Sequence, residues 1–256
     1  LSGLLRTSVL SSLRSHVRRL FKSDRLRQVL EFPVLFLGAT PKNPPALYSL
    51  MNHADIDLGT WYPMGGMGKV MDAMRTVAEG QGAVIHTSEA VTRIIVERGR
   101  AIGVETARGG YTADTVLATA DYHHVEKDLL APEQRSYSAN FWKRRTMAPS
   151  TLLFYIGLDT RLPGAEHHTL FFDEDLDEHG ADIYTHQRWP GKPLFYVSCT
   201  SRTDPSAAPP GCENVVILVP IASASVDDEA TREHYFEIIA DRMQRHLGLD
   251  IREHIL

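Results

Sequence analysis

The chain has 256 residues, 43% of them hydrophobic and 23% charged, and a formal net charge of −5. This length and apolar content allow a sizeable core in one large domain or two small ones. The negative charge argues against a general nucleic-acid binder, which would present a broad basic face, and no apolar run approaches the ~18 residues of a membrane-spanning helix.

Residues 1–30 predict one or two amphipathic helices. Apolar residues recur at every fourth position, at Leu5, Val9, Leu13 and Val17. The opposite face is basic and carries Arg6, Arg14, Arg18, Arg19, Lys22, Arg25 and Arg27. Two interpretations stay open: the apolar stripe lies on an anionic membrane, or the helices are partly buried domain helices whose basic face is solvated.

A glycine-rich turn precedes the next predicted helix, which spans residues 69–79. Residues 61–68 read WYPMGGMG. Glycines let a backbone approach a ligand closely, and a helix N-terminus offers unpaired N–H groups, so the turn suits a flavin edge or a phosphate. It is not the dinucleotide fingerprint, because residue 71 is Met, nor a P-loop, because Val70 follows Lys69. A tight turn that caps a helix is the alternative interpretation.

A strand-rich stretch follows the helix. Strands are predicted at residues 83–86, 91–97, 101–106, 111–113 and 115–119, and a helix at 121–130. The last strand ends in small residues, which would let backbone groups reach a nucleotide at the carboxyl end of a sheet. Nearly any sheet strand ends in this way, so the pattern alone does not indicate a nucleotide site.

The second half of the chain predicts further strands and a long final helix. The strands lie at residues 151–158, 167–172, 194–200 and 214–220, and the apolar runs 152–158 and 215–222 favour buried strands. Cys199 and Cys212 fall on neighbouring strands and are interpreted as buried thiols in a reducing compartment. The helix at residues 228–247 places five side chains on its buried side: Tyr235, Phe236, Ile239, Met243 and Leu247.

Histidines and acidic residues gather between residues 167 and 186. No pair among them has the spacing of a zinc motif. Asp173, Asp175 and Asp177 resemble the start of a calcium loop, but Glu178 stands where that loop needs glycine. The residues therefore favour a solvated acidic loop and no metal, within a mixed α/β chain that carries a candidate ligand-binding turn.

Six segments carry a resemblance to a known family along essentially the whole chain. They are residues 21–28, 61–68, 149–158, 167–172, 196–203 and 204–211, the last reading DPSAAPPG. The chain resembles bacterial-type phytoene desaturases, FAD-dependent carotenoid desaturases of the amine-oxidase-like superfamily. The resemblance implies a partial Rossmann-type FAD-binding domain at residues 61–130. It places a substrate domain, with a mixed or antiparallel sheet and helices, at residues 1–60 and 131–256, the first part membrane-associated.

The resemblance also implies a function and a cofactor site. The family uses FAD to insert double bonds into phytoene or a related long polyene, with a hydride moving to the flavin and a proton to a base or solvent. The backbone of Val91 is expected at the adenine end of FAD, and Gly65, Gly66 and Met67 beside the isoalloxazine ring. Thr119, Ala120 and Asp121 are expected at the end of the strand that backs the nucleotide. Because the polyene is insoluble in water, a cytoplasmic enzyme lying peripherally on membrane lipid is expected, with no nucleic acid as a partner.

Two departures from the family limit these expectations. The amino-terminal glycine fingerprint and the carboxy-terminal flavin segment are absent from the sequence, so the chain is interpreted as an internal fragment that holds FAD poorly. No catalytic residue is assigned, and the oligomeric state is left open. The alternatives are a carotenoid isomerase, ketolase or retinol-saturase-like flavoprotein, or a truncated non-catalytic product that binds a membrane or partner.

Overall fold

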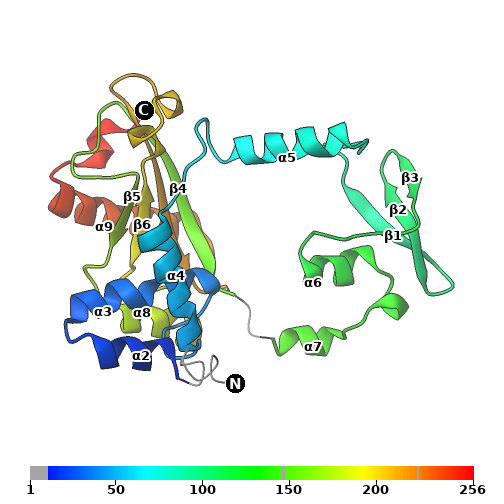
Figure 1. The fold of residues 1–256 in the computed structure, drawn as a ribbon, viewed down its shortest axis with the longest axis horizontal. Helices are drawn as coiled ribbons and strands as arrows, with labels where there is room; N and C mark the ends of the chain where they lie inside the picture. The colour runs from blue at the N-terminus through cyan, green and yellow to red at the C-terminus, as the bar shows by residue number, and fades with distance from the viewer. Residues whose placement is uncertain (1–10, 146–147, 224) are drawn as a thin grey trace. The chain divides into compact units, whose positions relative to one another are not determined.

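The computed structural model describes residues 11–145, 148–223 and 225–256 of the chain (Figure 1). These residues belong to two compact units, each of which is described by itself. Unit 1 comprises residues 1–71 and 148–256, and unit 2 comprises residues 72–147. The combination of helices and sheets confirms the expected mixed α/β fold class.

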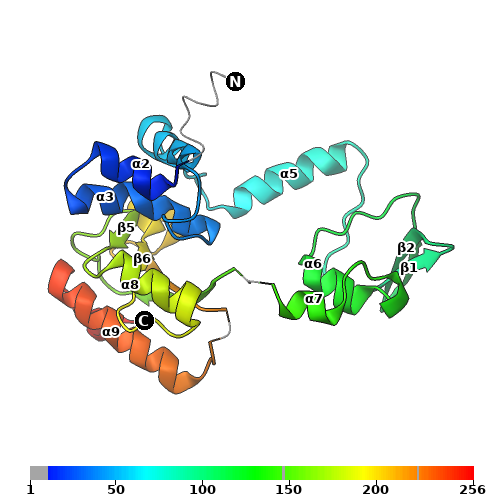
Figure 2. The same ribbon diagram turned by 90° about the horizontal axis from the view of Figure 1, so that it is seen from below.

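A four-stranded antiparallel sheet organises unit 1. Its strands are β4 (Ser150–Leu158), β5 (His168–Phe171), β6 (Phe195–Ser198) and β7 (Glu213–Ile221), in the order β4-β7-β6-β5. Buried and half-buried side chains alternate along the whole of β7. One face packs on α9 (Glu229–Leu247, orange to red in Figure 2), where Ile217, Ile239 and Met243 are fully buried. The predicted buried side of this helix is confirmed.

Short helices complete unit 1. Those before the sheet are α2 (Leu13–Leu20), α3 (Asp24–Glu31), η1 (Phe32–Leu37), η2 (Ala46–Ser49), α4 (Leu50–Asn52) and η3 (His53–Leu58). Those between and after the strands are α8 (Leu176–Gly180), η6 (Ala181–His186), η7 (Thr200–Arg202), η8 (Pro205–Ala207) and η9 (Ile251–His254). The hydroxyls of Ser12 and Ser23 accept backbone N–H groups at the starts of α2 and α3, which explains where these helices begin.

Two arginines of the predicted basic face form ion pairs within unit 1. Arg14 donates to Asp177 and pairs with Glu31, which also receives Arg18. The Arg14 side chain is only 11% exposed. Hydrogen bonding to Asp177 raises the pKa of Arg14 and lowers that of Asp177. Arg14 therefore joins α2 to α8 and is not available as a solvated charge. The predicted positions Leu5, Arg6 and Val9 lie outside the described residues.

Unit 2 is built on a three-stranded antiparallel meander. Its strands, in spatial order, are β1 (Val91–Glu97), β2 (Arg100–Thr106) and β3 (Gly109–Thr112). Its helices are α6 (Tyr122–His124), η4 (Val125–Leu129), η5 (Pro132–Gln134) and α7 (Ala139–Lys143), and α5 (Gly68–Gly80) crosses from unit 1 into unit 2. Ile94 of β1 packs against Val125 and Leu129 of η4, so the helical segment after residue 121 covers the hairpin.

Three strand predictions are corrected by the structure. Residues 83–86 and 115–119 are not strands, and Val84 and Leu117 are 79% and 85% exposed. An apolar run becomes a strand only where another backbone pairs with it, and the ladder of the meander ends at Thr112. The third correction is β4, which is not buried on both faces: Tyr155 is 75% exposed, because α9 covers only one side of the sheet.

The structure also shows the environment of the two cysteines and of the acidic loop. Cys199 is buried, Cys212 is half-buried and both are free thiols. Burial raises the pKa of the Cys199 thiol to about 12. The acidic loop is paired rather than simply solvated: Asp173 binds Arg242 and His246, and Asp175 caps α8.

Candidate functional site

The WYPMGGMG segment forms the tight turn that the sequence predicts. Gly65 and Gly66 have φ angles of +87° and +94°, where side chains of L-residues are strained. The Gly66 N–H donates to the Pro63 carbonyl at 3.0 Å, and the Lys69 N–H donates to the Gly66 carbonyl at 3.0 Å. The turn therefore leads directly into α5 and is closed by its own backbone.

The carboxylate of Asp204 supports this turn from a distant part of the sequence. Asp204 lies between η7 and η8 and is 2% exposed. Its Oδ2 accepts the Gly65 N–H at 2.6 Å and lies 3.5 Å from the Tyr62 hydroxyl. Its Oδ1 accepts the Ser206 hydroxyl at 2.6 Å and the Ser206 N–H at 3.0 Å. The Ser206 hydroxyl, and then the Gly65 N–H, hold the pKa of Asp204 below its ordinary value.

A row of rings connects the turn to the sheet. The Tyr62 ring meets His167 edge-on with centroids 4.8 Å apart, and His167 lies 4.3 Å from His168. The His168 Nδ1 lies 2.5 Å from the Tyr196 hydroxyl, and the His167 Nδ1 lies 2.7 Å from the Thr203 hydroxyl. Burial, followed by the neighbouring His168, lowers the pKa of His167. The row ends at Tyr196, which lines an apolar cavity.

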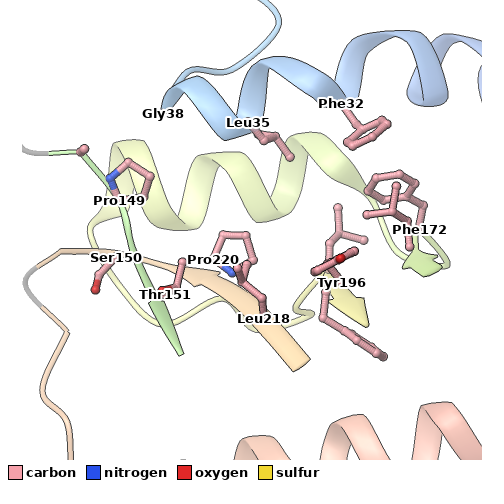
Figure 3. Close-up of a pocket in the computed structure, with 14 residues that line it drawn as sticks. Phe32, Leu35, Gly38, Pro149, Ser150, Thr151, Phe172, Tyr196, Leu218 and Pro220 are labelled. Atoms are coloured by element: carbon pink, nitrogen blue, oxygen red, sulfur yellow. The ribbon is translucent and has the colours of Figure 1, made fainter. Parts of the chain in front are cut away.

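The cavity lies between η1 and the sheet and has a volume of about 300 Å³ (Figure 3). Phe32 and Leu35 line it from η1, and Figure 3 shows them above Leu218 and Pro220 of β7. The rings of Phe32 and Phe172 lie 5.0 Å apart at the side near Tyr196. None of the 14 described residues that line the cavity is charged. Such a cavity favours an apolar ligand over an ionic one.

Three of the residues that line the cavity belong to an apolar row that crosses the whole sheet. Residue register pairs Leu153 with Leu218, Leu218 with Tyr196, and Tyr196 with Leu170. Four neighbouring strands make such a row about 14 Å wide, at roughly 4.8 Å per step. Leu153 and Leu170 are 38% and 37% exposed, so the row is not covered by the packing of unit 1. We call these four side chains the apolar floor.

The residues predicted to touch the cofactor fall in both units. Gly65, Gly66 and Met67 share the turn of unit 1, and Met67 is 64% exposed. In unit 2, Val91 begins β1 opposite Thr106, and the Asp121 carboxylate accepts the His124 N–H at 3.0 Å as the N-cap of α6. Thr119 and Ala120 lie in the exposed segment just before it.

The turn leaves open space at Gly66 and Gly68, whereas a Cβ on Gly65 would lie 3.0 Å from the Lys69 side chain. A Cβ on Gly66 would lie 3.8 Å from its nearest neighbour, the Tyr62 hydroxyl, and a Cβ on Gly68 would have no neighbour within 4 Å. The Asp204 carboxylate that binds the turn and the apolar cavity at the sheet were not found from the sequence. Their only signals were Asp204 before Pro205, which is typical of a turn, and the aromatic residues of segment 167–172.

A glycine turn that a row of rings joins to an uncharged cavity, on a mixed α/β fold, is an arrangement suited to a cofactor and an apolar substrate. The chain matches the family model of flavin-containing amine oxidoreductases over residues 4–254, and it belongs to this family. Membership confirms the expected amine-oxidase-like superfamily, and the family is one of flavin-containing oxidoreductases.

Two curated relatives place the chain more closely within the family. It is 36% identical over 249 residues to the carotenoid 3,4-desaturase of Haloarcula japonica, a match that covers 97% of this chain and 50% of that protein. It is 34% identical over 212 residues to the phytoene desaturase of Neurospora crassa, covering 79% of this chain and 36% of that protein. The expected resemblance to carotenoid desaturases is confirmed. The chain spans half the length of these relatives or less.

A solved structure has the same fold. An oxidoreductase from Methanosarcina mazei aligns with a TM-score of 0.63 at 20% identity, over 94% of this chain and 54% of that one. Among the helices that the structure describes, none is both long enough and apolar enough to cross a membrane.

Proposed function

We propose that this chain is part of an FAD-dependent oxidoreductase that desaturates phytoene or a related carotenoid precursor. One observation carries the proposal: within unit 1, the glycine turn is joined by a row of rings to an uncharged cavity and the apolar floor. A long polyene has no polar group for a protein to recognise. Its site must therefore be shaped by apolar side chains, as this one is.

The roles of the residues follow from their positions. The flavin, when bound, accepts the hydride that leaves the polyene. Gly65, Gly66 and Met67 would lie beside its isoalloxazine ring, with Val91 at the adenine end and residues 119–121 behind the nucleotide. The apolar floor and the cavity walls bind the chain of the polyene and exclude water from it. Unit 1 then acts as the substrate domain, and unit 2 is part of the FAD-binding domain.

A peripheral position on the membrane completes the proposal. Arg19, Lys22 and Arg25 are exposed at α2 and α3, together with the apolar side chains of Leu20 and Leu26, which are 57% and 41% exposed. Cations beside exposed apolar side chains are typical of surfaces that bind anionic lipid. This surface would keep the enzyme close to the membrane in which a polyene dissolves.

Pigment analysis tests the proposed activity. The complete gene that contains this chain is expressed in cells that accumulate phytoene, and the extracted polyenes are separated by chromatography. Desaturation yields products with more conjugated double bonds, which absorb at longer wavelengths. Unchanged phytoene would contradict the proposal. A product altered only in double-bond geometry would favour the isomerase alternative, and an oxygenated product would favour the ketolase.

A further inference from the structure

The carboxylate beneath the glycine turn is more than the turn needs for its own closure. The turn already closes through the Gly66 N–H and the Pro63 carbonyl. Asp204 lies 139 residues further along the chain, yet its Oδ2 accepts the Gly65 N–H at 2.6 Å. A hydrogen bond to a charged acceptor is stronger than one to a neutral acceptor, so this contact fixes the direction of the Gly65 peptide group.

The Asp204 carboxylate is itself oriented by hydrogen bonds from Ser206. Ser206 satisfies Oδ1 with both its hydroxyl and its N–H, which orients Oδ2 towards the turn. The Asp204 N–H donates to the Thr200 carbonyl at 2.9 Å, and this ties the segment to η7, next to β6. Asp204 therefore links the position of the turn to the sheet that carries the apolar floor.

We propose that Asp204 is a positioning residue, whose buried carboxylate holds the Gly65–Gly66 turn in the orientation that meets the isoalloxazine ring. The inference rests on the proposed function, because it assumes that a flavin contacts this turn. Asp204 is covered by its own partners, so it acts on the flavin through Gly65 rather than by contact.

Three variants separate positioning from a general role in stability. Asp204→Asn replaces one acceptor oxygen by an NH₂ group, so that Gly65 or Ser206 faces a donor in place of an acceptor. Ser206→Ala removes one bond to Oδ1 but leaves the Gly65 contact in place. Asp228→Asn alters an unrelated helix cap, where the carboxylate accepts the Thr231 N–H at 2.8 Å. Asp228 is exposed, so this variant controls for the loss of a capping carboxylate elsewhere in the chain.

The first measurement is amide hydrogen exchange across residues 61–68 of this chain. We expect Asp204→Asn to speed the exchange of the Gly65 amide by about tenfold or more, as the loss of a hydrogen bond to a charged group implies. Ser206→Ala should have a smaller effect and Asp228→Asn none. Asp204→Glu, which keeps the charge, should restore part of the protection.

The second measurement is flavin binding by the protein expressed from the complete gene. We expect Asp204→Asn to weaken flavin binding about tenfold or more, or to shift the visible absorption band, while Asp228→Asn does neither. If flavin binds and Asp204→Asn leaves its affinity, its band and the Gly65 exchange unchanged, the positioning role is wrong and the proposed function stands. If the wild-type protein binds no flavin, the proposed function fails, and the inference with it. If both Asp204 variants unfold, Asp204 is a residue of the fold and the inference is overturned.

Discussion

Acidification should destabilise this chain through one buried histidine. His179 lies in α8 and is 1% exposed. Its Nδ1 accepts the Leu194 N–H at 2.8 Å. Burial lowers the pKa of His179 from its ordinary 6.5 to about 4, outweighing the opposing effects of the Pro220 backbone and then of Asp182.

The sign and size of the effect follow from proton binding. Below pH 6.5 the unfolded chain binds a proton at His179 that the folded chain refuses until the pH nears 4. Stability is therefore present above the unfolded pKa and falls as the pH drops through this window. Each pKa unit corresponds to about 1.4 kcal/mol, so the loss across the window is roughly 3 kcal/mol.

Urea unfolding, followed by tryptophan fluorescence at pH 7 and pH 4.5, measures this loss. Other groups also titrate, so the comparison is with His179→Asn, whose Oδ1 occupies the place of Nδ1 and can accept the Leu194 N–H. Between the two pH values we expect the wild-type chain to lose roughly 2–3 kcal/mol more of its free energy of unfolding than the variant loses. Equal losses would refute a neutral buried His179.

Three further predictions concern the core, the floor and the surface. Glu213 is fully buried and paired with Arg161 and Arg202, so Glu213→Gln should lower the free energy of unfolding in urea by about 3 kcal/mol. The exposed control Glu233→Gln should lower it by about 0.5 kcal/mol or less, and similar losses would show that the two ion pairs of Glu213 contribute little. Leu170→Asn should abolish retention of carotenoid on the purified whole protein, whereas Val226→Asn, at a 74% exposed site, should not; equal retention would argue against the apolar floor as the binding surface. Replacing the exposed Arg19, Lys22 and Arg25 by Glu should weaken sedimentation with anionic vesicles at least about tenfold, while the control Arg245→Glu leaves it unchanged; unaltered binding of the triple variant would remove this surface from consideration.

Helices and strands with a clear apolar period and flanking turn or cap residues were predicted correctly from the sequence. β1 spans residues 91–97 as the sequence predicts, and α9 spans residues 229–247, within one residue of its predicted start. In each case the period of the apolar side chains and the flanking turn or cap residues agree. The glycine turn was also predicted, since consecutive glycines before a helix indicate backbone at positive φ.

Contacts between distant residues were not predictable in the same way. The residues near Gly65 do not indicate that its N–H donates to Asp204. The residues of α2 do not indicate that Arg14 binds Asp177. The failed strands have the same cause, because Val84 and Leu117 lie in apolar runs whose pairing depends on another backbone. The cavity was missed for this reason too: its walls come from η1, β4, β5, β6 and β7, which are separate in the sequence.

Side chains that alternate along β7 lie on the two opposite faces of the sheet. Val215, Ile217 and Val219 face α9 and are at most 1% exposed, while Val216, Leu218 and Pro220 face the other way. Exchanges at the even-numbered positions can therefore reshape the surface offered to a substrate with little disturbance to the packing beneath. Under the proposed function, divergence towards new polyenes would accumulate on that side of the strand. A shift in strand pairing by one residue would destroy both the packing and the exposed face.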